Sequence, residues 1–322
     1  MSAPRRYLVT GATGQDGSYL VERALAAGDE VHGMCHTEAA AAQLAVETPA
    51  CIPHVGDLGN EAGLRELIAD VKPTHIVNLA GRTSVAWSWD SPTEAADLMG
   101  VAPVRLYEAA WLQSQNDALP VKMLQASSAE IFGNAVDVPQ TEKTPLAPVN
   151  PYGAAKAFAH QMAGIYRARG LHVSTAILYN HESPRRPDTF VTQKIVGGVV
   201  RIARGRQEQL VLGNLDAQRD WGYAPDYVDA MLHILEQPAA SDYIVATGVA
   251  HSVRDFVAAA FVVVGITDWE SHVIIDPALH RPADPSKLVG DASKLRSTGW
   301  APSVDFGALV EKMVAAELEA GL

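Results

Sequence analysis

The sequence predicts an α/β protein with a doubly wound parallel sheet, and three observations carry this prediction. Short apolar runs alternate with helical stretches of ten or more residues through the first 179 positions. A glycine-rich turn directly follows the first of these runs. The chain has 322 residues, of which 48% are hydrophobic and 19% are charged. This balance is typical of globular proteins, and the length suffices for one large domain or two lobes around a cleft.

The spacing of apolar residues identifies each element in turn. Residues 18–27 illustrate the helical pattern, since their apolar residues recur at helical spacing until Gly28 ends it. The predicted strands are residues 6–10, 30–34, 51–55, 75–80, 121–126 and 172–179. The predicted helices are residues 18–27, 38–46, 61–71, 95–113, 152–170 and, near the end of the chain, 304–320.

The alternation becomes less regular from about position 180. Proline and glycine become frequent there, and arginines accumulate. We therefore expect a first domain over residues 1–179 and a smaller lobe over residues 180–322, with some segments of the lobe returning to the first domain. Ligands bind at the carboxyl edge of such sheets, so the lobe is expected to fold over that edge.

Composition and charge exclude several classes of protein. A net charge of −12 weighs against a nucleic-acid partner, because phosphates would be repelled on average. No apolar run reaches membrane-spanning length, and the first residues lack a signal-peptide pattern. The 2 cysteines have no Cys/His pairs nearby, which argues against a disulfide framework and a metal site. We expect a cytoplasmic protein without nucleic-acid, membrane or metal partners.

The glycine turn lies between the first predicted strand and the first predicted helix, with glycines at positions 11, 14 and 17. Glycine allows the tight turn and the close approach of a pyrophosphate, whose oxygens then face the N–H groups at the helix start. The placement therefore predicts a Rossmann-type site for a dinucleotide. A turn with a purely structural role is the alternative.

A second motif combines a tyrosine with a lysine. Tyr152 and Lys156 are four positions apart, so they share one face of a helix. A lysine ammonium lowers the pKa of a nearby phenol and favours the phenolate, which accepts a proton. The alternative is an amphipathic helix with a half-buried tyrosine and a solvated lysine.

Polar residues at the end of the preceding strand extend this motif. A hydroxyl there, from Ser127 or Ser128, can hydrogen-bond the reacting oxygen of a substrate, although a serine can also cap the turn. A simple dehydrogenase needs only the hydroxyl, the tyrosine and the lysine. Glu130 therefore suggests a second proton transfer, and its alternative reading is a solvated loop carboxylate.

The Gly-x-x-Gly-x-x-Gly spacing, together with Tyr152 and Lys156, resembles the short-chain dehydrogenase/reductase superfamily. The resemblance implies a nicotinamide cofactor and favours Ser128 over Ser127. Asp57 would contact the adenine, and Ala80 would line the cofactor. In full, the implied cofactor-binding residues are Gly11, Thr13, Gly14, Gln15, Asp16, Gly17, His36, Asp57, Leu58, Leu79, Ala80, Tyr152 and Lys156.

Three longer strings, at residues 179–194, 212–227 and 280–291, narrow the resemblance to the GDP-mannose 4,6-dehydratase family. The family likeness covers nearly the whole chain. It implies that the GDP portion of the substrate is held by Asn180, Val191, Lys194, Arg219, Arg281 and Asp284. At the last of these positions the family has a glutamate near the ribose of the nucleotide.

The resemblance also implies a reaction with four catalytic residues. Tyr152, supported by Ser128 and Lys156, would take the O4 proton while a hydride passes from C4 to the cofactor. Glu130 would then remove the C5 proton, and water would leave from C6. Return of the hydride to C6 would give GDP-4-keto-6-deoxymannose.

The sequence departs from the family after the second predicted strand. The family has an arginine pair there for the 2′-phosphate of NADP, whereas this chain has residues 33–37, Gly-Met-Cys-His-Thr, with neither arginine nor carboxylate. Arg185 and Arg186, which in the family reach the cofactor of a neighbouring subunit, are candidates to compensate. NADP is the expected cofactor, NAD is the alternative, and a homodimer or homotetramer is expected.

Three other functions compete with the dehydratase. A GDP-4-keto-6-deoxymannose reductase would keep the serine, tyrosine and lysine, but Glu130 and the string that begins at Asn180 favour the dehydratase. Another sugar-nucleotide epimerase or dehydratase is the second alternative. A non-catalytic nucleotide-sensing module is the third, and the retained glycines, Tyr152 and Lys156 argue against it.

Overall fold

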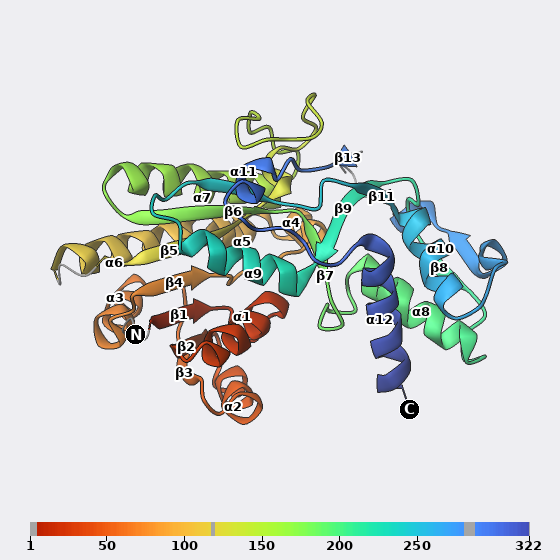
Figure 1. Ribbon diagram of the computed structural model, residues 1–322, viewed down its shortest axis with the longest axis horizontal. Coiled ribbons are helices and arrows are strands. Elements are labelled where there is room, and N and C mark those ends of the chain that lie inside the picture. The colour runs from red at the N-terminus through yellow and green to blue at the C-terminus, as the bar shows by residue number, and fades with distance from the viewer. Residues whose placement is uncertain (1–4, 117–119, 280–286, 322) are drawn as a thin grey trace.

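A seven-stranded parallel sheet forms the centre of the molecule (Figure 1). The computed structural model describes residues 5–116, 120–279 and 287–321. The strand order is β10-β6-β5-β4-β1-β2-β3, and every pairing is parallel. The strands are β1 (Arg6–Thr10), β2 (Glu30–Cys35), β3 (Ile52–Val55), β4 (His75–Asn78), β5 (Lys122–Ser128), β6 (His172–Leu178) and β10 (Asp242–Val245). The predicted doubly wound α/β fold is confirmed.

The chain reverses direction across the sheet between β1 and β4. It first builds β2 and β3 on one side of β1, and then returns to place β4 on the other side. Thr10 at the end of β1 therefore lies opposite both Met34 of β2 and Asn78 of β4. Such a switch point is where ligands bind in this class of sheet, at the carboxyl ends of the strands.

Helices cover both faces of the sheet (Figure 1). One face packs against α1 (Gln15–Ala26), α2 (Glu38–Glu47) and α9 (Ala224–Leu235), and the other against α3 (Glu61–Val71), α6 (Ala102–Asn116) and α7 (Pro151–Ala168). The neighbours Leu8 and Val9 are both fully buried but belong to different clusters, because successive strand side chains point to opposite faces. A strand buried on both sides explains the nearly continuous apolar runs of the sequence.

The helix predicted over residues 95–113 is interrupted in the structure. It begins at the end of α5 (Pro92–Ala96), passes through a π-helical turn (Asp97–Val101) and continues in α6, and the short helix α4 (Val85–Asp90) precedes it. Pro103 near the start of α6 has no N–H to donate to the carbonyl one turn earlier, and a widened turn accommodates its ring. The strand predicted to run to Ala80 also ends earlier, at Asn78.

The second part of the chain builds a smaller lobe around its own core. Trp221 and Phe256 lie at the centre of this core, with ring centroids 5.4 Å apart. The lobe contains β7 (Asn180–Glu182), α8 (Val191–Ala203), β8 (Leu210–Leu212), β9 (Gln218–Tyr223), β11 (Ala250–Ser252), α10 (Val253–Val263), β12 (Val273–Ile275), β13 (Lys287–Leu288) and α12 (Phe306–Ala320). The short helix α11 (Ser293–Arg296) packs instead against β10 and the core of the central sheet. In Figure 1, α8, α10 and α12 gather at the end away from β1–β3. No helix within the described ranges is long and apolar enough to cross a membrane.

A buried carboxylate joins the lobe to the sheet. Asp220 of β9 accepts hydrogen bonds from the N–H groups of Thr247 and Gly248, each at 2.8 Å, just beyond the end of β10. It also accepts one from Gly290 at 3.3 Å. Burial raises the pKa of Asp220, while these donors favour its charged form. The contacts fix β9, and with it Arg219, beside the carboxyl edge of the sheet.

Candidate functional site

The turn after β1 can be built only with glycine at two of its positions. Gly11 has a φ of 68°, and a Cβ placed on it would lie 2.9 Å from the Ala80 nitrogen. A Cβ on Gly17 would lie 2.1 Å from the Gly11 carbonyl oxygen. Both neighbours are backbone atoms and cannot move aside cheaply. The turn thus brings the start of α1 tightly against the ends of β1 and β4.

The start of α1 fits a diphosphate. Gly14 is the N-cap residue, and no side chain caps the helix there. By contrast, side chains cap α2, α3, α7, α10 and α12. Thr13 and Gly14 are exposed, so an anion can approach the N–H groups of the first turn. Glycine leaves room for the phosphates, and the helix dipole favours their charge.

The side chains of Gln15 and Asp16 turn away from that opening toward β7. Asp16 Oδ2 lies 2.9 Å from His181 Nε2, and Gln15 Nε2 donates to the His181 carbonyl at 3.2 Å. Burial alone would oppose both charges, but their mutual attraction outweighs it, so the pKa of Asp16 is lowered and that of His181 is raised. The predicted cofactor turn is therefore fastened to the second lobe through one ion pair.

A chain of buried polar groups aligns the ends of β1, β4 and β5. The Thr10 hydroxyl donates to Asn78 Oδ1 at 2.6 Å, and Asn78 Nδ2 donates to Gln125 Oε1 at 2.7 Å. The Ala80 N–H donates to Thr10 Oγ1 at 3.1 Å. These bonds fix the half-buried Leu79 and Ala80 beside the glycine turn, where the family resemblance predicts that they line the cofactor.

Tyr152 and Lys156 lie on the buried face of α7, at its first two turns. Their exposed fractions are 6% and 5%. Lys156 Nζ donates to the Ala126 carbonyl at 3.0 Å and lies 5.9 Å from the Tyr152 ring centroid. Burial lowers the pKa of Lys156 to about 8, which still keeps the ammonium predominant at neutral pH. The predicted pair is thus assembled at the carboxyl end of β5.

Burial raises the pKa of Tyr152 to about 12, and two neighbours act in the opposite direction. One is the hydrogen bond with Ser128, the hydroxyl that the family resemblance selected, and the other is the charge of Arg186. Arg186 binds Glu182 at 3.1 Å, and its guanidinium carbon lies 3.6 Å from the Phe190 ring centroid. This arginine of the same chain therefore joins the expected set of serine, tyrosine and lysine.

Glu130 follows Ser128 in a short helical turn and faces the start of α7. The Glu130 N–H donates to Ser128 Oγ at 3.2 Å. Its carboxylate accepts a hydrogen bond of 2.8 Å from Asn150 Nδ2. The negative charge of Glu130 acts on Tyr152, which it makes harder to ionise. The structure therefore brings all four predicted catalytic residues into one site.

The remaining predicted cofactor residues follow β2 and β3. His36 is exposed after β2, and the next residue, Thr37, caps α2. Asp57 is exposed after β3, where its carboxylate accepts from the Gly59 N–H at 2.8 Å, and Leu58 is buried. All three lie at the carboxyl ends of strands on the side of β1 away from α7, as expected for residues near an adenosine.

The predicted substrate residues come from three elements of the lobe. Asn180 of β7 lies opposite Trp221 of β9. Val191 and the exposed Lys194 are in the first turn of α8, a helix without a side-chain cap. Arg219 of β9 is 6% exposed. Arg281 and Asp284 lie outside the described residues.

Sequence reasoning missed the contributions of His181, Arg186 and Asn150. His181 and Arg186 stand in the string that carried the family resemblance, but spacing gave no sign of the contact with Asp16 or of the charge on Tyr152. Asn150 could have been found, since an asparagine before Pro151 is typical of a helix start. Its bond to Glu130 depends on tertiary packing.

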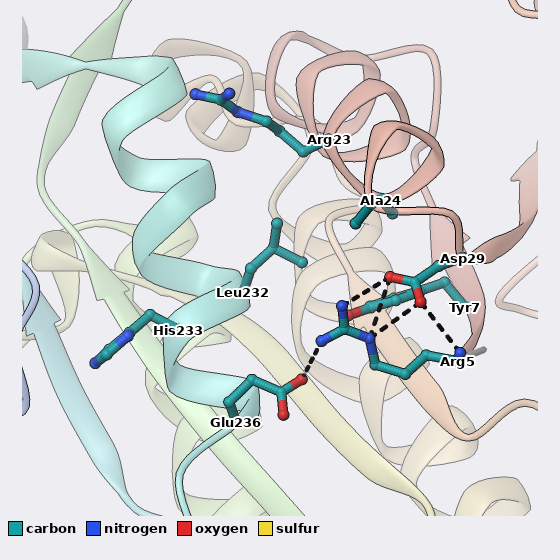
Figure 2. Close-up of a pocket in the computed structure, with 9 residues that line it drawn as sticks. Arg5, Tyr7, Arg23, Ala24, Asp29, Leu232, His233 and Glu236 are labelled. Carbon is teal, nitrogen blue, oxygen red and sulfur yellow. Dashed lines mark hydrogen bonds and ion pairs between the residues drawn. The ribbon is translucent and has the colours of Figure 1, made fainter. Parts of the chain in front are cut away.

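A hollow lies at the opposite, amino edge of the sheet (Figure 2). It encloses about 270 Å³, between the start of β1 and the helices α1 and α9. Arg5 crosses its mouth and pairs with Asp29 at 2.9 Å and with Glu236 at 2.6 Å. Arg5, Asp29 and Glu236 therefore bind each other, while Arg23 on the same wall pairs with Asp229 at 3.0 Å.

Comparison with known proteins agrees with this geometry. A family model described as GDP-mannose 4,6 dehydratase matches residues 8–313. GDP-mannose 4,6 dehydratase 1 of Arabidopsis thaliana is 42% identical over 329 residues, which cover 98% of this chain and 91% of that protein.

Solved structures share the fold. UDP-glucose 4-epimerase of Thermotoga maritima, in complex with UDP-glucose, has a TM-score of 0.85 and 21% identity, covering 98% of this chain and 100% of that one. RMD of Pseudomonas aeruginosa, complexed with NADPH, has a TM-score of 0.80 and 23% identity, with 98% and 99% covered. At these identities the likeness concerns the fold alone. Because the family model and the Arabidopsis relative both span nearly the whole chain, this chain belongs to the GDP-mannose 4,6-dehydratase family.

Proposed function

We propose that this protein converts GDP-mannose to GDP-4-keto-6-deoxymannose by loss of water. The observation that carries the proposal is the carboxylate of Glu130 in the same site as Ser128, Tyr152 and Lys156. An alcohol oxidation needs one proton acceptor, and elimination of water needs a second. The names of the family model and of the Arabidopsis relative support the same substrate.

A nicotinamide dinucleotide fits the glycine turn, because the uncapped start of α1 and the two glycines without room for a Cβ form a cradle for a diphosphate. A bound nicotinamide would supply a site for the C4 hydride until that hydride is returned to C6, so it would not be consumed. The turn would hold its phosphates, with Asp57 and Leu58 beside the adenine and Leu79 and Ala80 along its length. NADPH in the Pseudomonas structure supports a cofactor of this class.

Tyr152 is proposed to accept the proton of the sugar O4. Ser128 would hold the same oxygen, and its hydrogen bond and the Arg186 charge both ease loss of the phenol proton. Lys156, whose ammonium is fixed by the Ala126 carbonyl, keeps a positive charge close to the phenol. Oxidation at C4 makes the C5 proton acidic, and Glu130 would remove it before water leaves from C6.

The lobe is proposed to hold the GDP portion. Lys194 and the uncapped start of α8 offer charge and N–H groups to phosphates, and Arg219 offers a planar fork. Asn180, Val191, Arg281 and Asp284 are proposed contacts by family resemblance. In this division, residues 1–179 bind the dinucleotide and residues 180–322 bind the sugar nucleotide, with β10 and α9 returning to the first domain.

NADP is the proposed cofactor, with NAD as the alternative. Within the described residues no carboxylate directly follows β2 to bind a ribose 2′-hydroxyl. The exposed His36 stands there instead, and its imidazole can donate to a phosphate. The test is calorimetric titration of both dinucleotides against the protein and its His36→Asp variant. We expect tighter binding of NADP to the original protein and a preference for NAD in the variant. Tighter binding of NAD by the original protein would contradict this choice.

We also propose a homodimer or homotetramer in the reducing cytoplasm. A mostly apolar hollow of about 400 Å³ lies between α5 and α7, where Val101 and Phe158 are 41% and 44% exposed. A second copy would cover this surface, and the two buried free cysteines suit a reducing compartment. Light scattering should give at least twice the monomer mass, and Phe158→Glu should lower it.

The activity is tested by incubating the protein with GDP-mannose and catalytic NADP. We expect a 4-keto sugar nucleotide to form, as monitored by mass spectrometry. The amount of NADPH should show no net change. A requirement for a keto-sugar substrate and stoichiometric NADPH would identify a reductase instead. The two outcomes differ because only the dehydratase regenerates its cofactor within one turnover.

A further inference from the structure

One buried asparagine contacts both halves of the catalytic site. Asn150 is the N-cap residue of α7, and its Oδ1 accepts a hydrogen bond of 2.7 Å from the Gly153 N–H. Its Nδ2 donates to Glu130 Oε2 at 2.8 Å. The side chain is 4% exposed, so water does not compete freely for either bond.

The orientation of this amide follows from its partners. The Gly153 N–H can only donate, so the amide oxygen must face it, and the NH₂ group is left to face the carboxylate. The backbone is equally constrained: a Cβ on Gly153 would lie 2.5 Å from the Glu130 carbonyl oxygen, and the Ala147 N–H donates to the Ile131 carbonyl at 3.0 Å. The Glu130 turn and the start of α7 therefore form one tightly closed unit.

Capping alone does not require asparagine. Serine and aspartate cap helices about as well, because both offer an oxygen to the first-turn N–H groups. Asparagine differs because its acceptor and its donor are separate atoms, so Oδ1 accepts from Gly153 while Nδ2 reaches Glu130. Serine has a single oxygen on a shorter side chain, and an ionised aspartate has no donor. The second bond is thus the property that distinguishes this residue from other caps.

We propose that Asn150 is the positioning residue for Glu130. It ties the carboxylate to the first turn of α7, two residues before Tyr152, and so sets the spacing between the two proton acceptors. The inference rests on the proposed function, in which Glu130 removes the C5 proton. Its neutral amide stabilises the charged carboxylate without supplying a proton to it, which suits a group that must act as a base.

The test is Asn150→Ser, which keeps a cap acceptor but removes the amide nitrogen that reaches Glu130. Asn60 is a matched control, because its Oδ1 caps α3 by accepting from Gly63 at 3.1 Å and its substitution by serine changes only a cap. We expect Asn150→Ser to lower kcat about 100-fold with a nearly unchanged KM, as for a misplaced base. Oxidation at C4 should persist, so reduced cofactor should accumulate at 340 nm in single turnovers. Asn60→Ser should resemble the original protein.

A second variant separates positioning from folding. Asn150→Asp keeps the cap acceptor but sets a carboxylate against Glu130, so kcat should fall further than in the serine variant, with thermal unfolding within a few degrees of the original protein. Normal turnover of Asn150→Ser would overturn the inference. The inference would also be overturned if the variant lost C4 oxidation and water elimination to the same extent, because reduced cofactor would then not accumulate. If the original protein itself leaves GDP-mannose unchanged, the proposed function fails, and that result is visible before any variant is made.

Discussion

The two edges of the central sheet both carry buried or half-buried charged residues, yet they differ in what those charges do. At the amino edge, Arg5 pairs with Asp29 and Glu236, and these contacts raise the pKa of its guanidinium, although burial opposes them. At the carboxyl edge, burial lowers the pKa of Lys156 to about 8 and raises that of Tyr152 to about 12. The first arrangement pairs its charges with each other, and the second keeps the Lys156 ammonium buried against a backbone carbonyl oxygen.

This difference shows why a hollow alone does not identify a site. The amino-edge hollow is a real cavity, but its polar groups fasten the start of β1 to α9 (Figure 2). A buried ammonium such as that of Lys156 costs stability, and such groups persist in proteins chiefly where chemistry uses them. Helix starts left without a side-chain cap, as at Gly14 and Phe190, point the same way at the carboxyl edge.

The largest expected effect is a loss of turnover that should occur on substitution at the carboxyl edge and not at the amino edge. Tyr152→Phe removes the proposed proton acceptor and should lower turnover about 1,000-fold, within the range known for acid–base groups. Tyr7→Phe is the matched control, since Tyr7 is equally buried but lines the amino-edge hollow. Steady-state kinetics with GDP-mannose measure both. A similar loss in the two variants would remove the functional distinction between the edges.

The glycine turn gives the next largest effect. Gly17→Ala places a methyl group 2.1 Å from the Gly11 carbonyl oxygen, so α1 must shift and cofactor affinity should fall at least about 100-fold. Gly28→Ala is the control: its φ is 83°, but no atom lies within 4 Å of the new methyl. That variant should lose only about 1–2 kcal/mol of stability and bind cofactor normally. Fluorescence titration and thermal unfolding test the pair, and unchanged cofactor affinity in Gly17→Ala would contradict the cradle.

The sequence predicted the fold and most of the candidate site because both depend on local patterns. The alternation of strands and helices, the glycine turn, and the spacing of Tyr152 and Lys156 are all set by neighbours along the chain. The π-helical turn at Asp97–Val101 was missed because apolar periodicity continues through it. The bonds of Asp16 to His181 and of Glu130 to Asn150 join residues 165 and 20 positions apart, so only the packed structure reveals them.

A smaller effect concerns the stability cost of the catalytic lysine. The pKa of Lys156 is about 8 in the folded protein and about 10.5, its usual value, in the unfolded chain. Between pH 8 and pH 10.5 the unfolded chain therefore binds one more proton than the folded protein. Stability should therefore rise with pH across that window, and the full cost, about 3 kcal/mol, should apply below pH 8. Lys156→Met should be inactive, yet more stable at pH 7 by up to this amount. Urea unfolding at pH 7 and pH 10 tests it, and a destabilised variant at pH 7 would contradict the burial argument.

The smallest effect is expected where the charges are already satisfied. Arg5→Gln breaks both ion pairs at the amino edge. Water screens the pair with Glu236, because Arg5 and Glu236 are 37% and 47% exposed at their side chains. Asp29 is only 6% exposed, but it keeps the hydrogen bond of 3.1 Å from the backbone N–H of residue 5. Unfolding free energy should fall by less than about 1 kcal/mol, and turnover should stay unchanged. High salt should shrink the difference in stability, because exposed pairs are screened. A fall in turnover would mean that the amino-edge hollow communicates with the site across the sheet, and the two edges could then no longer be treated as independent.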